Sequence, residues 1–83
     1  MIKSKIAELK PSVRDASPLY LQLARKLGEA VRSGRYQAHE ALPSERTLSE
    51  SLGVSRVTAR KAIDQLVDQG LIVRKRGSGN YIA

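Results

Sequence analysis

Apolar residues recur with helical spacing in three segments of this 83-residue chain. In the first segment the apolar stripe consists of Leu19, Leu23, Leu27, Ala30 and Val31. Intervals of three and four residues place such a stripe on one face of a helix, so we predict a core helix over residues 18–33. Ser17 is the expected N-cap, Pro18 the first helical residue, and Gly34 ends the helix.

Two further amphipathic segments, at about 45–52 and about 56–69, are separated only by a tight turn. The shorter one begins after Ser44, an expected N-cap, and places Leu48 and Leu52 one turn apart on its inner face. The apolar stripe of the longer one consists of Ala59, Ala62, Ile63, Leu66 and Val67. Both segments are therefore predicted to be helices with one buried face each.

The turn between these two helices has a suitable residue at each position. Gly53 can take the left-handed conformation that ends a helix, and Val54 is expected to face inward. The Ser55 hydroxyl can cap the next helix by accepting a hydrogen bond from the amide of Val57 or Thr58. Two helices joined by a tight, glycine-containing turn predict a helix-turn-helix, whose second helix lies in a DNA major groove.

A glycine-rich hairpin is predicted after the third helix. Its strands are the apolar run 71–73 and the segment 80–83, and its tip is the basic segment 74–79. The tip glycines allow a positive φ and a close approach of the backbone to a ligand. Three helices followed by such a hairpin make a winged helix-turn-helix. The expected fold class is therefore mainly α with a small β-hairpin, in one domain over residues 17–83.

Three features lie outside these elements. Residues 1–16 hold four basic residues and an interrupting Pro11, and we expect a flexible basic N-terminal arm. Ala41-Leu42 is a candidate minimal strand. His39 is the only histidine and no cysteine accompanies it. We expect it to be a solvated loop residue rather than a metal ligand or a general base.

Composition adds a partner class and excludes several others. Fifteen Lys and Arg against eight Asp and Glu give a net charge of +7 and a pI of about 10.3. Such a balance indicates a polyanion partner, with a merely solvated surface as the alternative. The excess is spread evenly along the chain, so it does not locate the binding surface. Without cysteine, a long apolar run or a signal-peptide core, we expect a cytoplasmic protein with no membrane span, no metal and no cofactor.

The third predicted helix carries charges that are graded along its axis. Its bases occupy the first two turns and its acids the last two: Arg56, Arg60 and Lys61 against Asp64 and Asp68. A helix that enters the groove by its N-terminus keeps these acids away from phosphate, as recognition helices do. Val57 lies opposite the buried stripe. It either meets a thymine methyl group or is an ordinary surface valine.

Five short motifs follow one another between Pro18 and Ile82. They are Leu42-Pro43-Ser44-Glu45-Arg46, Leu52-Gly53-Val54-Ser55-Arg56, Thr58-Ala59-Arg60, Gly70-Leu71-Ile72 and Gly77-Ser78-Gly79-Asn80-Tyr81. In order and spacing they resemble the N-terminal winged-helix domain of the GntR family of bacterial transcription regulators. The resemblance departs at Ala59, where a larger aliphatic residue is usual, and at Asn80-Tyr81, where Thr-Phe is more common.

The resemblance implies roles for individual residues. DNA contacts are implied for Arg46, Ser55, Arg56, Thr58 and Arg60, and minor-groove contacts of the wing tip for Arg76 and Gly77. Members of the family carry a C-terminal domain that binds a small metabolite and usually dimerises. This chain is therefore expected to be either an excised DNA-binding domain, which we favour, or a natural stand-alone one. Pro18-Leu19-Tyr20 with Gln22 resembles the branch whose effector domain has a chorismate-lyase-like fold.

The expected function is sequence-specific binding of double-stranded DNA by a domain of a bacterial transcriptional regulator, a metabolite-responsive repressor. The expected DNA-binding residues are Ser44, Arg46, Ser55, Arg56, Val57, Thr58, Arg60, Lys61, Lys75, Arg76 and Gly77. The operator should be a two-fold repeat bound by two copies, and the full-length protein a homodimer. A small-molecule effector would bind only through the missing C-terminal domain, and this chain alone should be a monomer.

Three rival functions are weaker. A winged helix used for protein contact requires an exposed apolar patch, and the sequence offers only Val57 and scattered tyrosines. Recognition of unpaired RNA usually requires aromatic side chains for stacking, and the chain has three Tyr, no Phe and no Trp. An enzyme requires a catalytic group. The single loop histidine, the absence of cysteine and the lack of paired carboxylates leave no catalytic candidate.

Overall fold

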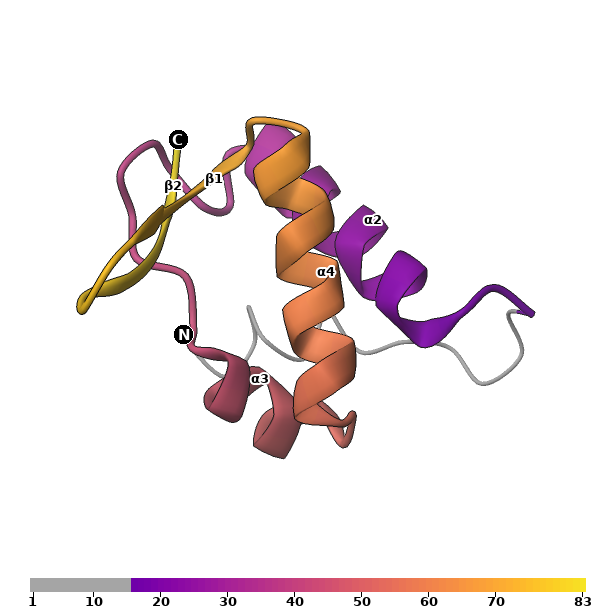
Figure 1. The fold of residues 1–83 in the computed structure, drawn as a ribbon. Helices are drawn as coiled ribbons and strands as arrows, with labels where there is room; N and C mark the ends of the chain where they lie inside the picture. Colours follow the sequence, from indigo (N-terminus) through magenta and orange to yellow (C-terminus); the bar gives the residue numbers. More distant parts are fainter. Residues whose placement is uncertain (1–15) are drawn as a thin grey trace.

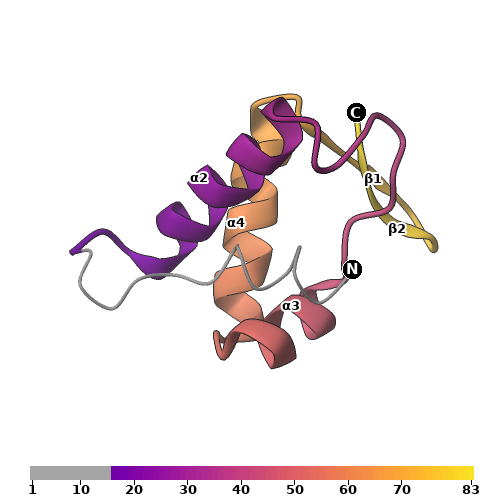
Figure 2. The ribbon, with the colours of Figure 1, turned by 180° about the vertical axis from the view of Figure 1, so that it is seen from behind.

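A computed structural model of the chain describes residues 16–83 (Figure 1). Its elements are α2 (Leu19–Arg32), α3 (Glu45–Leu52), α4 (Arg56–Asp68), β1 (Ile72–Lys75) and β2 (Gly79–Ile82). α4 lies at the centre, with α2 and α3 packed against it and the hairpin beside it, as the view from behind also shows (Figure 2). The predicted winged helix-turn-helix is confirmed. Except for Ala16, the predicted arm 1–16 lies outside the described residues and stays a prediction.

The start of α2 differs from the prediction by one residue. Pro18 is the N-cap with an extended ψ of 143°, and its carbonyl oxygen accepts hydrogen bonds from the amides of Leu21 and Gln22, both at 3.1 Å. The prediction of Ser17 as N-cap is therefore wrong. The Ser17 carbonyl oxygen instead accepts a hydrogen bond from Nε2 of Gln22 at 2.8 Å. Leu19, predicted to be buried, is 45% exposed because the hydrophobic core begins one helical turn later.

The helix-turn-helix forms as its sequence predicts. Ser44 caps α3 by accepting a hydrogen bond from the amide of Thr47 at 3.1 Å. Gly53 ends that helix with φ at +70°, a conformation that a side chain would strain. Ser55 caps α4 by accepting from the amide of Thr58 at 3.0 Å, which decides between the two predicted donors. These local features fix where α3 begins and ends and where α4 begins.

One hydrophobic core joins the helices to the hairpin. Its members are Leu23, Ala24, Leu27, Ala30, Tyr36, Leu42, Leu48, Leu52, Val54, Ala59, Ala62, Ile63, Leu66, Ile72 and Ile82. The predicted stripe of α4 is confirmed, with Val67 packed at its edge. Two core members, Tyr36 and Leu42, come from the connection after α2. Burial, and then the negative charge of Glu40, raise the pKa of the Tyr36 phenol.

The hairpin is longer in its first strand than predicted. β1 and β2 are antiparallel, and their register runs from Ile72 opposite Ile82 to Lys75 opposite Gly79. Arg74 and Lys75 therefore belong to β1, and the turn is confined to residues 76–78. The prediction of a tip over residues 74–79 is wrong because the strand pairing continues to Lys75, where the Ser78 amide donates to the Lys75 carbonyl oxygen at 3.0 Å.

The predicted minimal strand at Ala41 is confirmed as an isolated bridge to β2. Ala41 pairs with Tyr81, and the amide of Leu42 donates to the carbonyl oxygen of Asn80 at 2.9 Å. The amide of Ile82 donates to the carbonyl oxygen of Glu40 at the same distance. β2 is thus bonded on both sides. This bridge ties the wing to the segment that leads directly into α3.

Candidate nucleic-acid interface

The residues predicted to contact DNA lie on the surface of α3, α4 and the wing. All of them are exposed except Thr58, which is half-buried. Val57 is 56% exposed although it is a large apolar side chain. Because α4 buries its opposite face against α2 and α3, its N-terminal half presents these side chains to solvent.

A groove of about 310 Å³ connects the helix-turn-helix to the wing. Its lining comes from the bridge segment, the start of α3, the start of α4 and the wing: Ala41, Leu42, Ser44, Glu45, Arg46, Arg56, Ser78, Gly79 and Asn80. The groove brings together three predicted contacts, Ser44, Arg46 and Arg56. It also brings them beside the wing, which lies more than twenty residues further along the chain.

Six residues that line this groove are not among the predicted DNA-binding residues: Ala41, Leu42, Glu45, Ser78, Gly79 and Asn80. The signal that could have found the wing residues was the candidate strand at Ala41-Leu42. A strand there must pair with the hairpin, and Ser44 follows two residues after it. The pairing with β2 therefore carries the start of α3 to the wing.

The capping serines are already committed to hydrogen bonds. Besides its capping bond, Ser44 Oγ lies 3.0 Å from the Thr47 hydroxyl, and Ser55 Oγ lies 2.9 Å from the Thr58 hydroxyl. Each serine–threonine pair holds two hydroxyl hydrogens and uses one of them internally. One hydrogen per pair remains available for an acceptor outside the pair. Thr47, which is exposed and was not predicted, therefore joins the surface.

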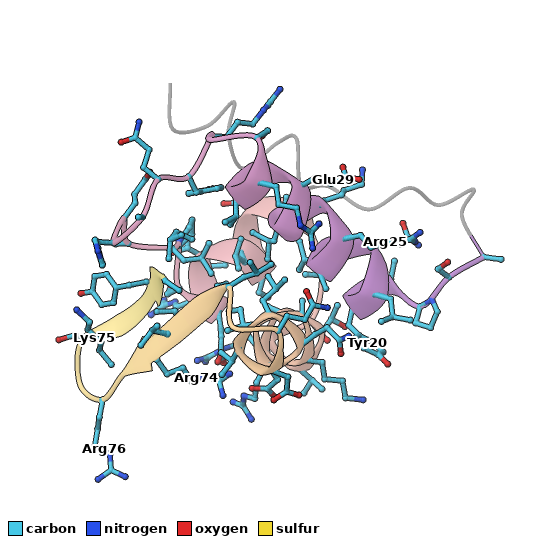
Figure 3. All side chains as sticks on the ribbon, turned by 90° about the horizontal axis from the view of Figure 1, so that it is seen from above. Tyr20, Arg25, Glu29, Arg74, Lys75 and Arg76 are labelled. Atoms are coloured by element: carbon cyan, nitrogen blue, oxygen red, sulfur yellow. The ribbon has the colours of Figure 1, made fainter. Side chains whose placement is uncertain are left out.

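The four arginines of this surface fall into two groups. Arg46 lies 3.6 Å from Glu50 of its own helix, and Arg60 donates from Nε to Oε1 of Glu45 at 3.3 Å. Arg56 and Arg76 have no acidic partner within residues 16–83. Arg56 lines the groove, and Arg76 projects from the wing tip away from the helices (Figure 3). Among the described residues, no carboxylate therefore offsets the positive charge of these two guanidinium groups.

Arg74 has a different role from the one predicted for the basic segment 74–76. Its guanidinium forms an ion pair with Asp64 of α4, and Figure 3 shows it near that helix rather than at the wing tip. The pair links the wing to α4 and neutralises one of the two acids in the last turns of that helix. Arg74 therefore links β1 to α4. Its positive charge also offsets the negative charge of Asp64, so this acid repels an anion less than the sequence alone implies.

The two predicted lysines pack against aromatic rings. Nζ of Lys75 lies 4.8 Å from the centre of the Tyr81 ring, and Nζ of Lys61 lies 5.7 Å from that of Tyr20. Both ammonium groups stay exposed, so a cation–π contact orients each without removing its charge from solvent.

A capped helix-turn-helix, an exposed N-terminal half of the second helix and a basic hairpin joined to it by a groove define the winged helix-turn-helix class. The comparisons agree. Residues 19–82 match the family described as "Bacterial regulatory proteins, gntR family". The chain belongs to this family.

Two curated relatives and two solved structures illustrate the similarity. The chain is 46% identical over 68 residues to the HTH-type transcriptional regulator GgaR of Escherichia coli, and 38% identical over 66 residues to the HTH-type transcriptional repressor NagR of Bacillus subtilis. It superposes on YtrA from Sulfolobus acidocaldarius, a GntR-family transcription factor, with a TM-score of 0.83 and 33% identity over 92% of this chain and 79% of that one. The chain superposes on the DNA-binding domain of AraR, solved with operator ORX1, with a TM-score of 0.79 and 34% identity over 88% of each chain.

The match is limited to one part of the curated relatives. It covers 82% of this chain but 27% of GgaR, and 80% of this chain but 27% of NagR. The chain thus spans about a quarter of their length. Within residues 16–83 no helix has the length and apolar character needed to cross a membrane, and no three potential ligand residues are grouped to hold a metal ion.

Proposed function

We propose that this chain is the sequence-reading DNA-binding domain of a bacterial transcriptional regulator. The observation that carries the proposal is the groove that places Arg56, at the start of α4, beside the wing residues Ser78 and Gly79. Arg56 and Arg76 have no acidic partner among the described residues, so the helix start and the wing tip form one cationic surface. Such a surface fits a DNA strand that passes between the major groove and the adjacent minor groove.

The roles divide between reading and holding. The N-terminal half of α4 enters the major groove, where Arg56 and Arg60 bind guanine edges and Val57 meets a thymine methyl group. Ser55 caps that half, and Thr58 and Lys61 lie within it.

The other predicted residues contact phosphates and the minor groove. Ser44 and Arg46 at the start of α3 bind the DNA backbone, and Lys75, Arg76 and Gly77 bring the wing to the minor groove or to phosphates. The Asp64–Arg74 pair keeps the wing next to the reading helix.

The regulator acts as a repressor on a two-fold repeat operator bound by two copies. The relative NagR carries the name of a repressor, and the AraR domain was solved with an operator. In the full-length protein a C-terminal domain would bind a small metabolite and hold a homodimer in the cytoplasm. The assignment of that domain to the chorismate-lyase-like branch stays a prediction.

Selection of bound duplexes from a random pool tests the proposal. The expected result is a short enriched motif, recovered as an inverted repeat when longer duplexes are used. Single-stranded DNA and double-stranded RNA of the enriched sequence serve as controls and should bind more weakly. Recovery of no motif, or stronger binding to the RNA control, would contradict the proposed function.

A further inference from the structure

We infer that Glu45 is a positioning residue that holds Arg60 in the orientation with which it reads a base pair. The inference rests on the proposed function and assigns to that site a specificity-determining carboxylate. Glu45 is an acid on a surface that should bind a polyanion, so its place there requires a reason other than attraction to phosphate.

The contact between these residues joins two elements. Glu45 is the first residue of α3, Arg60 lies in the second turn of α4, and Nε of Arg60 donates to Oε1 of Glu45 at 3.3 Å. Fifteen residues separate them in the chain. The bond therefore fixes the Arg60 side chain relative to the whole helix-turn-helix rather than to its own helix alone.

The geometry leaves the reading end of Arg60 available. The bond uses Nε, and within the described part of the chain neither Nη nitrogen of Arg60 has a hydrogen bond. Guanine presents two acceptors, O6 and N7, to a planar pair of N–H donors in the major groove. A guanidinium held at Nε can present its two Nη groups end-on to these acceptors.

The environment of Glu45 makes the restraint effective. Its side chain is 21% exposed, against 58% for Arg60, and it stands in the first turn of α3, where the helix dipole favours a carboxylate. The neighbouring pair, Arg46 with Glu50, differs in both respects. It spans 3.6 Å within one helix, and its side chains are 74% and 68% exposed, so solvent screens it and it restrains little.

The same carboxylate should weaken binding to DNA in general. Glu45 lines the groove beside Arg46 and Arg56, where phosphate is expected, and a negative charge there repels phosphate of any sequence. Glu45 thus reduces affinity for all duplexes and improves discrimination by the one arginine that it orients. Specificity is a difference of affinities, and a repulsive group can increase it.

The test uses an operator enriched with the wild-type chain and a panel of its single-base variants. Arg60→Ala first identifies the base pair that Arg60 reads, where preference should fall from about 5- to 150-fold to near unity. Glu45→Gln removes the charge, and Glu45→Asp keeps it but shortens the reach. Both should lower preference at that same base pair by about two- to tenfold, because glutamine offers Arg60 only a neutral acceptor and the shorter aspartate holds Nε less closely. Glu45→Gln should also raise affinity for unrelated duplexes.

Glu50→Gln is the matched control, because it removes one negative charge from the same helix and frees Arg46. It should raise affinity for unrelated duplexes without changing any base preference. In an Arg60→Ala background, Glu45→Gln should cause no further loss of preference. Thermal unfolding of each variant shows whether the fold is retained.

Several outcomes would overturn the inference while leaving the proposed function intact. In one such outcome, Arg60→Ala lowers the preference at one base pair, but both Glu45 variants keep the wild-type preference there. Another is an equal loss of affinity for all duplexes with a lowered melting temperature, which would make Glu45 a structural residue. A third is an Arg60→Ala variant that keeps every preference. If the wild-type chain instead shows no sequence preference, the proposed function itself fails.

Discussion

Replacing Arg76 by alanine should weaken DNA binding through its salt dependence rather than through base preference. Seven Lys and Arg residues lie between Arg46 and Arg76 in the chain. One of them, Arg74, is held by Asp64, which leaves six cationic side chains to displace counterions from the DNA, whether each contacts a phosphate or a base edge. At roughly 0.9 released counterions per contact, log affinity should fall with log salt at a slope of about −5 per copy.

Arg76 is the residue whose removal should reduce this slope most cleanly. It has no acidic partner among residues 16–83, and it projects from the wing tip, so its loss exposes no buried group (Figure 3). Arg76→Ala should change the slope to about −4. Between about 50 and 200 mM salt the wild-type chain would then lose about 1,000-fold in affinity and the variant about 300-fold.

Fluorescence anisotropy with a labelled operator at several salt concentrations measures both slopes. Arg25→Ala is the matched control. It removes the same charge from an exposed position of α2, on the other side of the molecule from the wing, and should leave the slope unchanged (Figure 3). An unchanged slope in Arg76→Ala, or equal reductions in both variants, would refute the assignment of the wing tip to DNA. A wild-type slope near zero would refute DNA binding itself.

Three other predictions follow from the same structure. Arg56→Ala should cost about 1–3 kcal/mol of binding free energy and relax preference at one operator position, measured on a panel of single-base variants; an equal loss at all sequences would mean that Arg56 only holds phosphate. The chain without DNA should sediment as a monomer, and a stable dimer at micromolar concentration would contradict this prediction. Tyr36 has a raised pKa in the folded state, so the unfolded state releases the phenol proton first and the free energy of unfolding should fall as pH rises above about 10. Chemical denaturation at several pH values should show a smaller fall in Tyr36→Phe, and identical pH profiles in the two proteins would contradict this prediction.

The parts of the fold that depend on neighbouring residues could be predicted from the sequence. Ser44 and Ser55 each lie three residues before the amide that they cap, and Gly53 directly follows the helix that it ends. Local residue types therefore determine these helix ends. The start of α2 was missed because two adjacent residues, Ser17 and Pro18, both suit a helix start, and only the backbone hydrogen bonds distinguish them.

The contacts that tune the candidate site could not be predicted, because they join elements whose relative placement is tertiary. Arg60 with Glu45 and Arg74 with Asp64 are fifteen and ten residues apart. The number and order of charged residues in the sequence do not show which basic residue pairs with which acid. The end of β1 was misplaced for a similar reason: a basic, glycine-rich run suits a hairpin tip, but the pairing partner across the hairpin decides where the strand stops.

The pairing of β2 on both sides also reduces the tendency of the protein to aggregate. An unpaired strand edge invites another chain to add a strand, which is a route to aggregation. In this wing, residues 40–42 cover one side of β2, and β1 occupies the other. The outer edge of the hairpin is therefore β1, four residues long and ending in Arg74 and Lys75. Short, positively charged edges resist strand addition, so the basic residues beside the proposed DNA-binding surface also help to keep separate copies from joining edge to edge.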